Sequence, residues 1–164
     1  MRDPRQIADD LRSAVSEGTA LFNSASEERT TYRPAPDRWS ARQIIGHLID
    51  SACNNHRRFV INQGTETLMI DGYEQDQWVA RQRYHETSAS DLVALWAAYN
   101  TQIARVIEAM PPQDLTRSRG PMAGRRFPYT PLPDSQTVTL GHIVEDYVGH
   151  IRHHLGQIRR LLSA

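Results

Sequence analysis

The fold is decided in the stretch Trp39-Ser40-Ala41-Arg42-Gln43-Ile44-Ile45-Gly46-His47-Leu48-Ile49-Asp50. Ser40 and Gln43 match a capping box, in which the N-cap serine and the third helical residue satisfy each other's backbone N–H groups. Trp39, just before the cap, stands at the position of a hydrophobic staple. The apolar residues that follow recur every three or four positions, which predicts an amphipathic helix ending near residue 64.

Three further segments repeat this apolar pattern, and they span about residues 4–22, 88–110 and 137–162. Asp3 and Pro4 suit the N-cap and the first helical position of the first segment. No segments pair convincingly as strands, and the chain contains no internal repeat. The sequence therefore predicts an all-α fold, a four-helix bundle with long connecting loops, in a single domain over residues 1–164.

The connections between these helices are unusually long for a bundle. Residues 23–31 are polar. Residues 32–37 hold two prolines, which rule out helix there and predict an extended linker. Residues 65–87 are mixed, with a short helix expected at 74–84. Residues 113–136 hold two glycines and four prolines, which predict a long irregular loop. Connections of this length allow a crossover, so a simple up-and-down topology is not required.

Composition excludes several classes of function. The 164 residues carry 19 basic and 19 acidic side chains, and a net charge of zero argues against a nucleic-acid partner or a polybasic membrane surface. All 19 basic residues are arginine, which excludes a Schiff-base or P-loop lysine. The one cysteine, Cys53, excludes an intrachain disulfide, and we expect it to be a small buried residue. No targeting signal or membrane-spanning stretch is present, which predicts a cytoplasmic protein.

Histidine is the enriched residue, with seven in the chain and four of them between positions 142 and 154. His150 and His154 are four apart on the last predicted helix, so their side chains share one face and can bind one metal ion. The best candidate for a third ligand is His47, at the edge of the apolar stripe of the second helix. Three imidazoles leave a coordination position open, which is typical of a catalytic metal site. The alternative is a structural bundle in which these histidines are incidental.

The neighbours of these histidines offer partners that could orient the rings. Asp50 lies three residues after His47, Asp146 four residues before His150, and Gln157 three residues after His154. No chemical role is assigned to the other four histidines, which are His56, His85, His142 and His153.

Two motifs resemble those of a known family. The run from Arg38 to Asp50 is similar to the signature at the start of the second helix in the DinB/YfiT-like superfamily. The run His150-Ile151-Arg152-His153-His154-Leu155-Gly156-Gln157-Ile158 resembles its closing histidine motif, and residues 71–79 are similar to the segment after the second helix in some members. The resemblance implies a four-helix bundle that holds one divalent metal ion, such as Zn or Ni, on His47, His150 and His154.

The resemblance also carries expectations about activity. Characterised members transfer a low-molecular-weight thiol, such as mycothiol, bacillithiol or glutathione, to a small electrophile, and homodimers are common. We therefore expect a metal-dependent thiol transferase acting on a small molecule. The alternatives are a metal-dependent hydrolase and a stress protein that binds metal or small molecules without turnover. We expect Tyr73, Trp78 and the loop 113–136 to wall the pocket, with loop arginines binding a carboxylate; these are Arg117, Arg119, Arg125 and Arg126.

Overall fold

Side chains predicted to cap the helices do so in the computed structural model, which describes residues 2–119, 127–131 and 137–163. Asp3 accepts a hydrogen bond from the backbone N–H of Arg5, at 2.7 Å. Ser40 and Gln43 form both hydrogen bonds of the capping box. The long helices of the described chain are α1 (Pro4–Asn23), α3 (Ala41–Ile61), α5 (Ala89–Glu108) and α7 (Leu140–Ser163).

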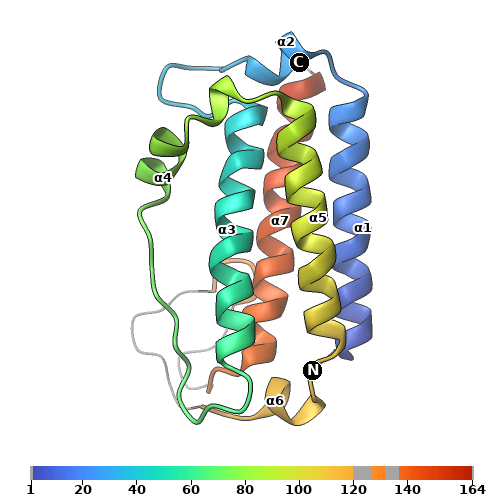
Figure 1. Cartoon of the computed structure of the whole chain (residues 1–164), viewed down its shortest axis with the longest axis vertical. Coiled ribbons are helices and arrows are strands. Elements are labelled where there is room, and N and C mark those ends of the chain that lie inside the picture. The colour runs from blue at the N-terminus through green and yellow to red at the C-terminus, as the bar shows by residue number, and fades with distance from the viewer. Residues whose placement is uncertain (1, 120–126, 132–136, 164) are drawn as a thin grey trace.

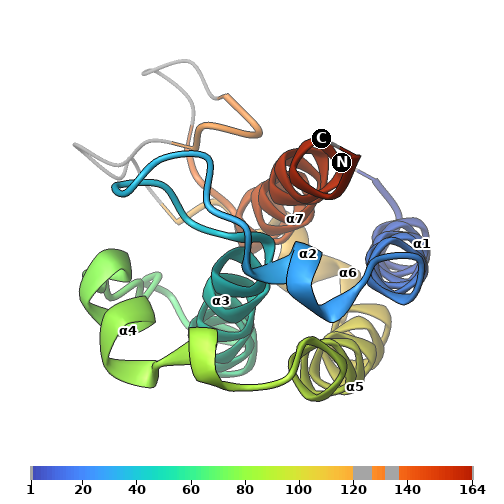
Figure 2. The same cartoon turned by 90° about the horizontal axis from the view of Figure 1, so that it is seen from above.

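The four long helices pack as a bundle with a crossed connection. Helix α1 packs against α5 and α7, and α3 packs against the same two helices. The first two long helices therefore occupy opposite corners, as the end-on view shows (Figure 2). Helices α1 and α7 run in one direction along the bundle, and α3 and α5 run in the other (Figure 1). The predicted all-α bundle is confirmed, and the chain adopts one of the crossovers that its long connections allow.

Short helices occupy the connections, and two of them correct the sequence prediction. The expected helix at 74–84 is α4 (Gln75–Gln82), followed by a single 3₁₀ turn, η1 (Tyr84–Glu86). Helix α2 (Glu27–Thr31) lies in the polar stretch where no helix was predicted, and α6 (Pro112–Thr116) lies at the start of the predicted irregular loop. Each has only five residues, too few to display an apolar period. The rest of the loop predicted at 113–136 lies partly outside the described residues.

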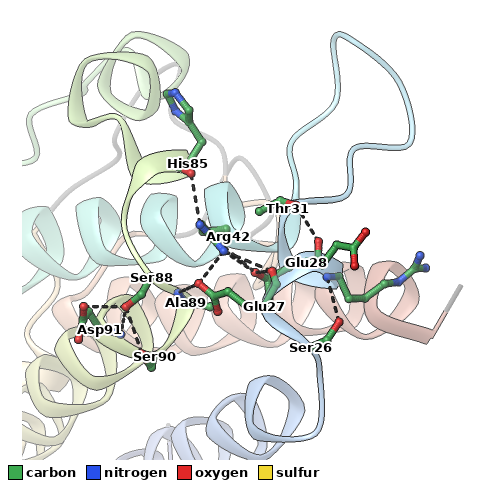
Figure 3. Close-up of polar contacts among 12 residues, drawn as sticks. Ser26, Glu27, Glu28, Thr31, Arg42, His85, Ser88, Ala89, Ser90 and Asp91 are labelled. Atoms are coloured by element: carbon green, nitrogen blue, oxygen red, sulfur yellow. Dashed lines mark hydrogen bonds and ion pairs between the residues drawn. The ribbon is translucent and has the colours of Figure 1, made fainter.

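A buried arginine joins three of the elements at the end of the bundle where α3 begins (Figure 3). Arg42 is only 7% exposed. Its guanidinium donates to Glu27 Oε1 at 2.7 Å and to the backbone carbonyl of His85 at 3.3 Å. The same Glu27 oxygen accepts the backbone N–H of Ala89 at 2.9 Å, at the start of α5. The pair thus ties α2 and η1 to the first turns of α3 and α5.

We expect Glu27→Gln to lower the free energy of unfolding by about 1 kcal/mol, because it leaves the buried Arg42 charge without its carboxylate partner. The effect is moderated because the Glu27 side chain is 56% exposed and its charge is screened. The matched control is Glu28→Gln, since the Glu28 side chain is exposed and bonds to no described residue. Urea denaturation of both variants measures the difference, and equal midpoints would contradict the prediction.

The core lies between the long helices and is built from their apolar stripes. Trp96 of α5, Phe59 of α3 and Leu155 of α7 are all fully buried. The hydroxyl of Tyr147 crosses this core to donate to Asn100 Oδ1 at 2.5 Å, which satisfies two buried polar groups. In the described part of the chain, every helix is too short or too polar to cross a lipid bilayer.

Candidate metal centre

The antiparallel arrangement of α3 and α7 brings the three selected histidines together. His47 lies in the second turn of α3, and His150 and His154 lie in the middle of α7, where the two helices pack against each other. One ring nitrogen of each lies within 4.8 Å of the others. The Nε2 atoms of His47 and His150 are 3.1 Å apart. His154 packs edge-on against both rings, with centroids 4.9 Å from His47 and 4.5 Å from His150.

Hydrogen bonds fix which nitrogens face the centre of the cluster. His154 Nδ1 lies 2.8 Å from Gln157 Oε1, which can only accept, so the proton is on Nδ1 and Nε2 keeps its lone pair. His150 Nδ1 lies 3.3 Å from the hydroxyl of Ser51. The hydroxyl oxygen can accept Nδ1–H, and in that tautomer Nε2 of His150 carries the lone pair. This network leaves the Nε2 lone pairs of both α7 histidines free.

Burial keeps the cluster uncharged. It is the main cause that lowers the pKa of His47 to about 4 and that of His150 to about 2. It likewise lowers the pKa of His154 to about 4. Neutral imidazoles with free lone pairs are the form that binds a metal ion. Nδ1 of His47 is buried and has no hydrogen-bond partner among the described residues. A donor set of three neutral, converging imidazoles therefore fits a divalent cation.

The predicted orienting partners are only partly right. Gln157 bonds His154 as expected. Asp50 instead accepts from the hydroxyl of Tyr84 at 2.6 Å and from the amide of Gln82 at 3.3 Å. Asp146 Oδ1 accepts hydrogen bonds from the backbone N–H groups of residues 129 and 130, in the loop before α7. Spacings of three and four residues predicted that these carboxylates lie on the same helix face as the histidines, but could not show that groups of η1 and of the loop before α7 would bond them.

Ser51 is the partner of His150 that the sequence did not single out. It lies one helical turn after His47, so its position in the α3 register was the available signal. Asn55 Nδ2 donates to the Ser51 hydroxyl at 3.2 Å and holds it in place. The Ser51 hydroxyl, on α3, therefore orients the His150 ring, on α7.

We expect Ser51→Ala to weaken Zn²⁺ binding by about tenfold, because the His150 ring loses the partner that holds its orientation. Competition with a chromogenic chelator measures this change. Ser90→Ala is the control, since Ser90 is an exposed serine on α5 whose hydroxyl bonds Ser88 and no other described residue. Equal chelator competition in the wild type and Ser51→Ala would show that the hydroxyl has no part in orienting the ring.

Two cavities approach the cluster from different sides. The larger, about 680 Å³, lies between the 34–39 turn, the start of α4 and the end of α7, and reaches His154. Trp39 lines it and also packs against the ring of His47, with centroids 5.1 Å apart. The smaller, about 200 Å³, reaches His150 and Ser51, and its walls include Tyr73 and Tyr129. Tyr73 and the described part of the 113–136 loop thus line the smaller cavity, as predicted.

Other sequence predictions about side chains need correction. Cys53 is exposed, because it lies on the outer side of α3 and not on its apolar stripe. Arg117 pairs with Glu66 at 2.8 Å, and Arg119 donates to backbone carbonyls, so neither is a free anion ligand. Trp78, expected in the pocket wall, lines neither of the two cavities at the cluster. Its ring packs against that of Tyr73 instead, with centroids 5.0 Å apart. Arg125 and Arg126 lie outside the described residues.

The remaining histidines take structural positions. The ring of His142 accepts the backbone N–H of Thr139, whose hydroxyl accepts the N–H of His142, so the pair caps α7. His153 bonds the amide of Gln157 at 3.0 Å, and this contact fixes the orientation of that amide. His56 lies 3.4 Å from the hydroxyl of Tyr99, and the His85 ring is exposed.

Comparison with known proteins accords with this geometry. A profile of the DinB superfamily matches residues 11–158, which include all three clustered histidines. The chain belongs to the DinB superfamily. A relative from Bacillus subtilis (strain 168), named "Putative metal-dependent hydrolase YfiT", is 24% identical over 156 residues, which are 95% of this chain and 80% of the relative. A relative from Oceanobacillus iheyensis, named "Putative metal-dependent hydrolase OB0782", is 26% identical over 132 residues, 80% of this chain and 69% of the relative.

A solved structure supports the fold of this DinB superfamily member. It is that of YfiT from Bacillus subtilis, described as "a probable metal-dependent hydrolase with an unusual four-helix bundle topology". The two chains superpose with a TM-score of 0.77 at 20% identity, over 96% of this chain and 85% of the other. The family predicted from the two histidine motifs is confirmed.

Proposed function

We propose that His47, His150 and His154 hold one divalent metal ion and that the protein uses it to transfer a low-molecular-weight thiol to a small electrophile. The observation that carries the proposal is the convergence of three neutral imidazoles within 4.8 Å, two of them buried and that of His150 half-buried. Three imidazole ligands suit Zn²⁺, Ni²⁺ and similar ions. A divalent ion with an open position lowers the pKa of a bound thiol or water by several units.

The chain's own residues hold and orient this site. Gln157 and Ser51 fix the rings of His154 and His150, and the indole of Trp39 covers the ring of His47. In the proposed reaction, the thiol sulfur forms a bond to the electrophilic carbon. In a substitution, the leaving group departs with the electron pair of its bond to that carbon; in an addition to a double bond, the π pair moves to the neighbouring atom, which takes up a proton from solvent. The thiol proton goes to solvent in both cases. The single cysteine of the chain, exposed on α3, takes no part.

Two observations favour thiol transfer over hydrolysis. First, a transfer reaction needs two molecules at one centre, and cavities reach the cluster both at His154 and at His150. Second, water starts from a much higher pKa than a thiol, so a metal-bound water is only partly ionised at neutral pH and gains more from a base that takes its proton. The nearest candidates are Asp50 and Asp146, and among the described residues neither carboxylate bonds to a clustered imidazole. A thiol that is already ionised at neutral pH needs no such base.

Hydrolysis is the second candidate, and the names of the relatives favour it, since both carry the words "metal-dependent hydrolase". Product analysis separates the two reactions. Protein loaded with Zn²⁺ or Ni²⁺ is incubated with a small electrophile and, in turn, with glutathione, bacillithiol and mycothiol. Metal-dependent formation of the thioether, detected by mass spectrometry, is the expected result. A product carrying hydroxyl in place of sulfur supports hydrolysis, and metal-independent rates in every mixture would contradict both.

A further inference from the structure

The 680 Å³ cleft that reaches His154 carries four charged side chains at its walls. Arg38 and Asp37 come from the turn before α3, Asp76 from the first turn of α4, and Arg160 from the last turns of α7. The volume lies in the range of small-molecule sites, about 300–1,000 Å³. The cleft therefore has both the size and the polar groups of a binding site next to the proposed metal centre.

None of these four side chains forms a hydrogen bond or an ion pair with a described residue. This distinguishes them from most other charges on the molecule. Arg117 and Arg159, for example, pair with Glu66 and Glu17, at 2.8 and 2.5 Å. Two cations and two anions that border one cavity without pairing with each other remain available to a ligand.

The turn that presents Arg38 is held in shape by its own contacts. The side chain of Arg33 donates to the backbone carbonyl of Arg38 at 2.8 Å and also to that of Pro36. The N–H of Arg38 bonds the carbonyl of Ala35 at 3.0 Å. The backbone under Arg38 and Asp37 is therefore preorganised, which lowers the entropic cost of binding there.

The charges decide the class of ligand. Two guanidinium groups and two carboxylates sum to zero, so the cleft does not attract an anion through its net field. Each guanidinium offers a planar fork that matches a carboxylate, and each aspartate can accept from an ammonium group. A ligand that carries both groups satisfies both signs, whereas a purely anionic ligand meets two repelling aspartates.

We propose that this cleft binds a small molecule bearing both a carboxylate and an ammonium group, with Arg38 and Arg160 on the carboxylate and Asp37 and Asp76 on the ammonium. The inference rests on the proposed function, because it places such a ligand beside His154, with its reactive group toward the histidine cluster. Peptide-like thiols with a free amino group and a free carboxylate belong to this class. A thiol without those charges does not.

The test uses the full chain loaded with Zn²⁺ and the probe S-methylglutathione, which carries both charged groups but cannot form a thiolate. Isothermal titration calorimetry gives its dissociation constant. Arg38→Gln and Arg160→Gln are each expected to weaken binding by about fivefold or more, and Asp76→Asn by about threefold. Arg105→Gln is the control, because Arg105 is exposed near the far end of α5 and its side chain bonds to no described residue.

Three results would overturn the inference. The first is a wild-type protein that does not bind the probe at millimolar concentration. The second is an unchanged dissociation constant in both arginine variants. The third is tighter binding by Asp76→Asn, which would indicate a simple anion site. The proposed function is judged separately: probe binding without thioether formation refutes thiol transfer alone, and turnover that the arginine variants leave unchanged refutes this subsite alone.

Discussion

Replacing His150 by alanine is expected to remove the metal from the purified protein. Three imidazoles from two helices form the whole donor set of the proposed site, and His150 Nε2 faces His47 Nε2 at 3.1 Å. Loss of one leaves two ligands, fewer than the three protein ligands of catalytic zinc sites. We expect the metal content to fall from about one ion per chain to below about one tenth, with an affinity loss on the order of a hundredfold or more. Elemental analysis after dialysis measures the content.

The pattern among variants distinguishes a shared site from incidental histidines. His47→Ala and His154→Ala should lose the metal as completely as His150→Ala, and double variants should lose no more, because every change spoils the same ion. His85→Ala is the control, since its ring is exposed and, among the described residues, its side chain pairs with Glu86 and with no clustered histidine. Circular dichroism establishes that each variant folds. Folded single variants that each keep about one ion per chain would contradict the site.

The histidines could be selected from the sequence because helical spacing is a local property. Two residues four apart on one helix share a face whatever the fold, so His150 and His154 were predictable as a pair. Pairing them with His47 required a second helix of known register, and the capping box at Ser40 supplied it. The antiparallel packing of α3 and α7, which brings the three together, appears only in the structure.

What escaped prediction depends on contacts between distant segments. Ser51 reaches His150 across the bundle, 99 residues along the chain. Asp50 turns to Tyr84 of η1, 34 residues away, and so does not orient His47. The walls of the charged cleft come from three separate segments, namely the 34–39 turn, α4 and the end of α7. The apolar period of one segment cannot predict such contacts, because they depend on the paths of the loops that connect the helices.

Replacing Gly18 by alanine is expected to destabilise the fold, because the added methyl group would overlap buried side chains. Gly18 lies within α1, where this helix packs against α5 and α7. A Cβ there would lie 2.7 Å from two ring carbons of Trp96 and 2.9 Å from Leu155 Cδ2. Both neighbours are fully buried, so neither ring nor methyl can move into solvent. We expect a loss of about 2–3 kcal/mol, or a melting temperature lower by roughly 5–10 °C.

The matched control is Gly156→Ala, because that glycine also lies inside a helix but has space around it. A Cβ there would meet only a guanidinium nitrogen of Arg160, at 3.8 Å. Alanine has the better helix propensity, so this variant should gain about 0.5–1 kcal/mol. The same propensity gain acts at Gly18, and the overlap with Trp96 must exceed it. Thermal denaturation of both variants tests the sign: a stabilised Gly18→Ala would mean that α1 and α5 can separate at little cost, so that the glycine is not what sets their spacing.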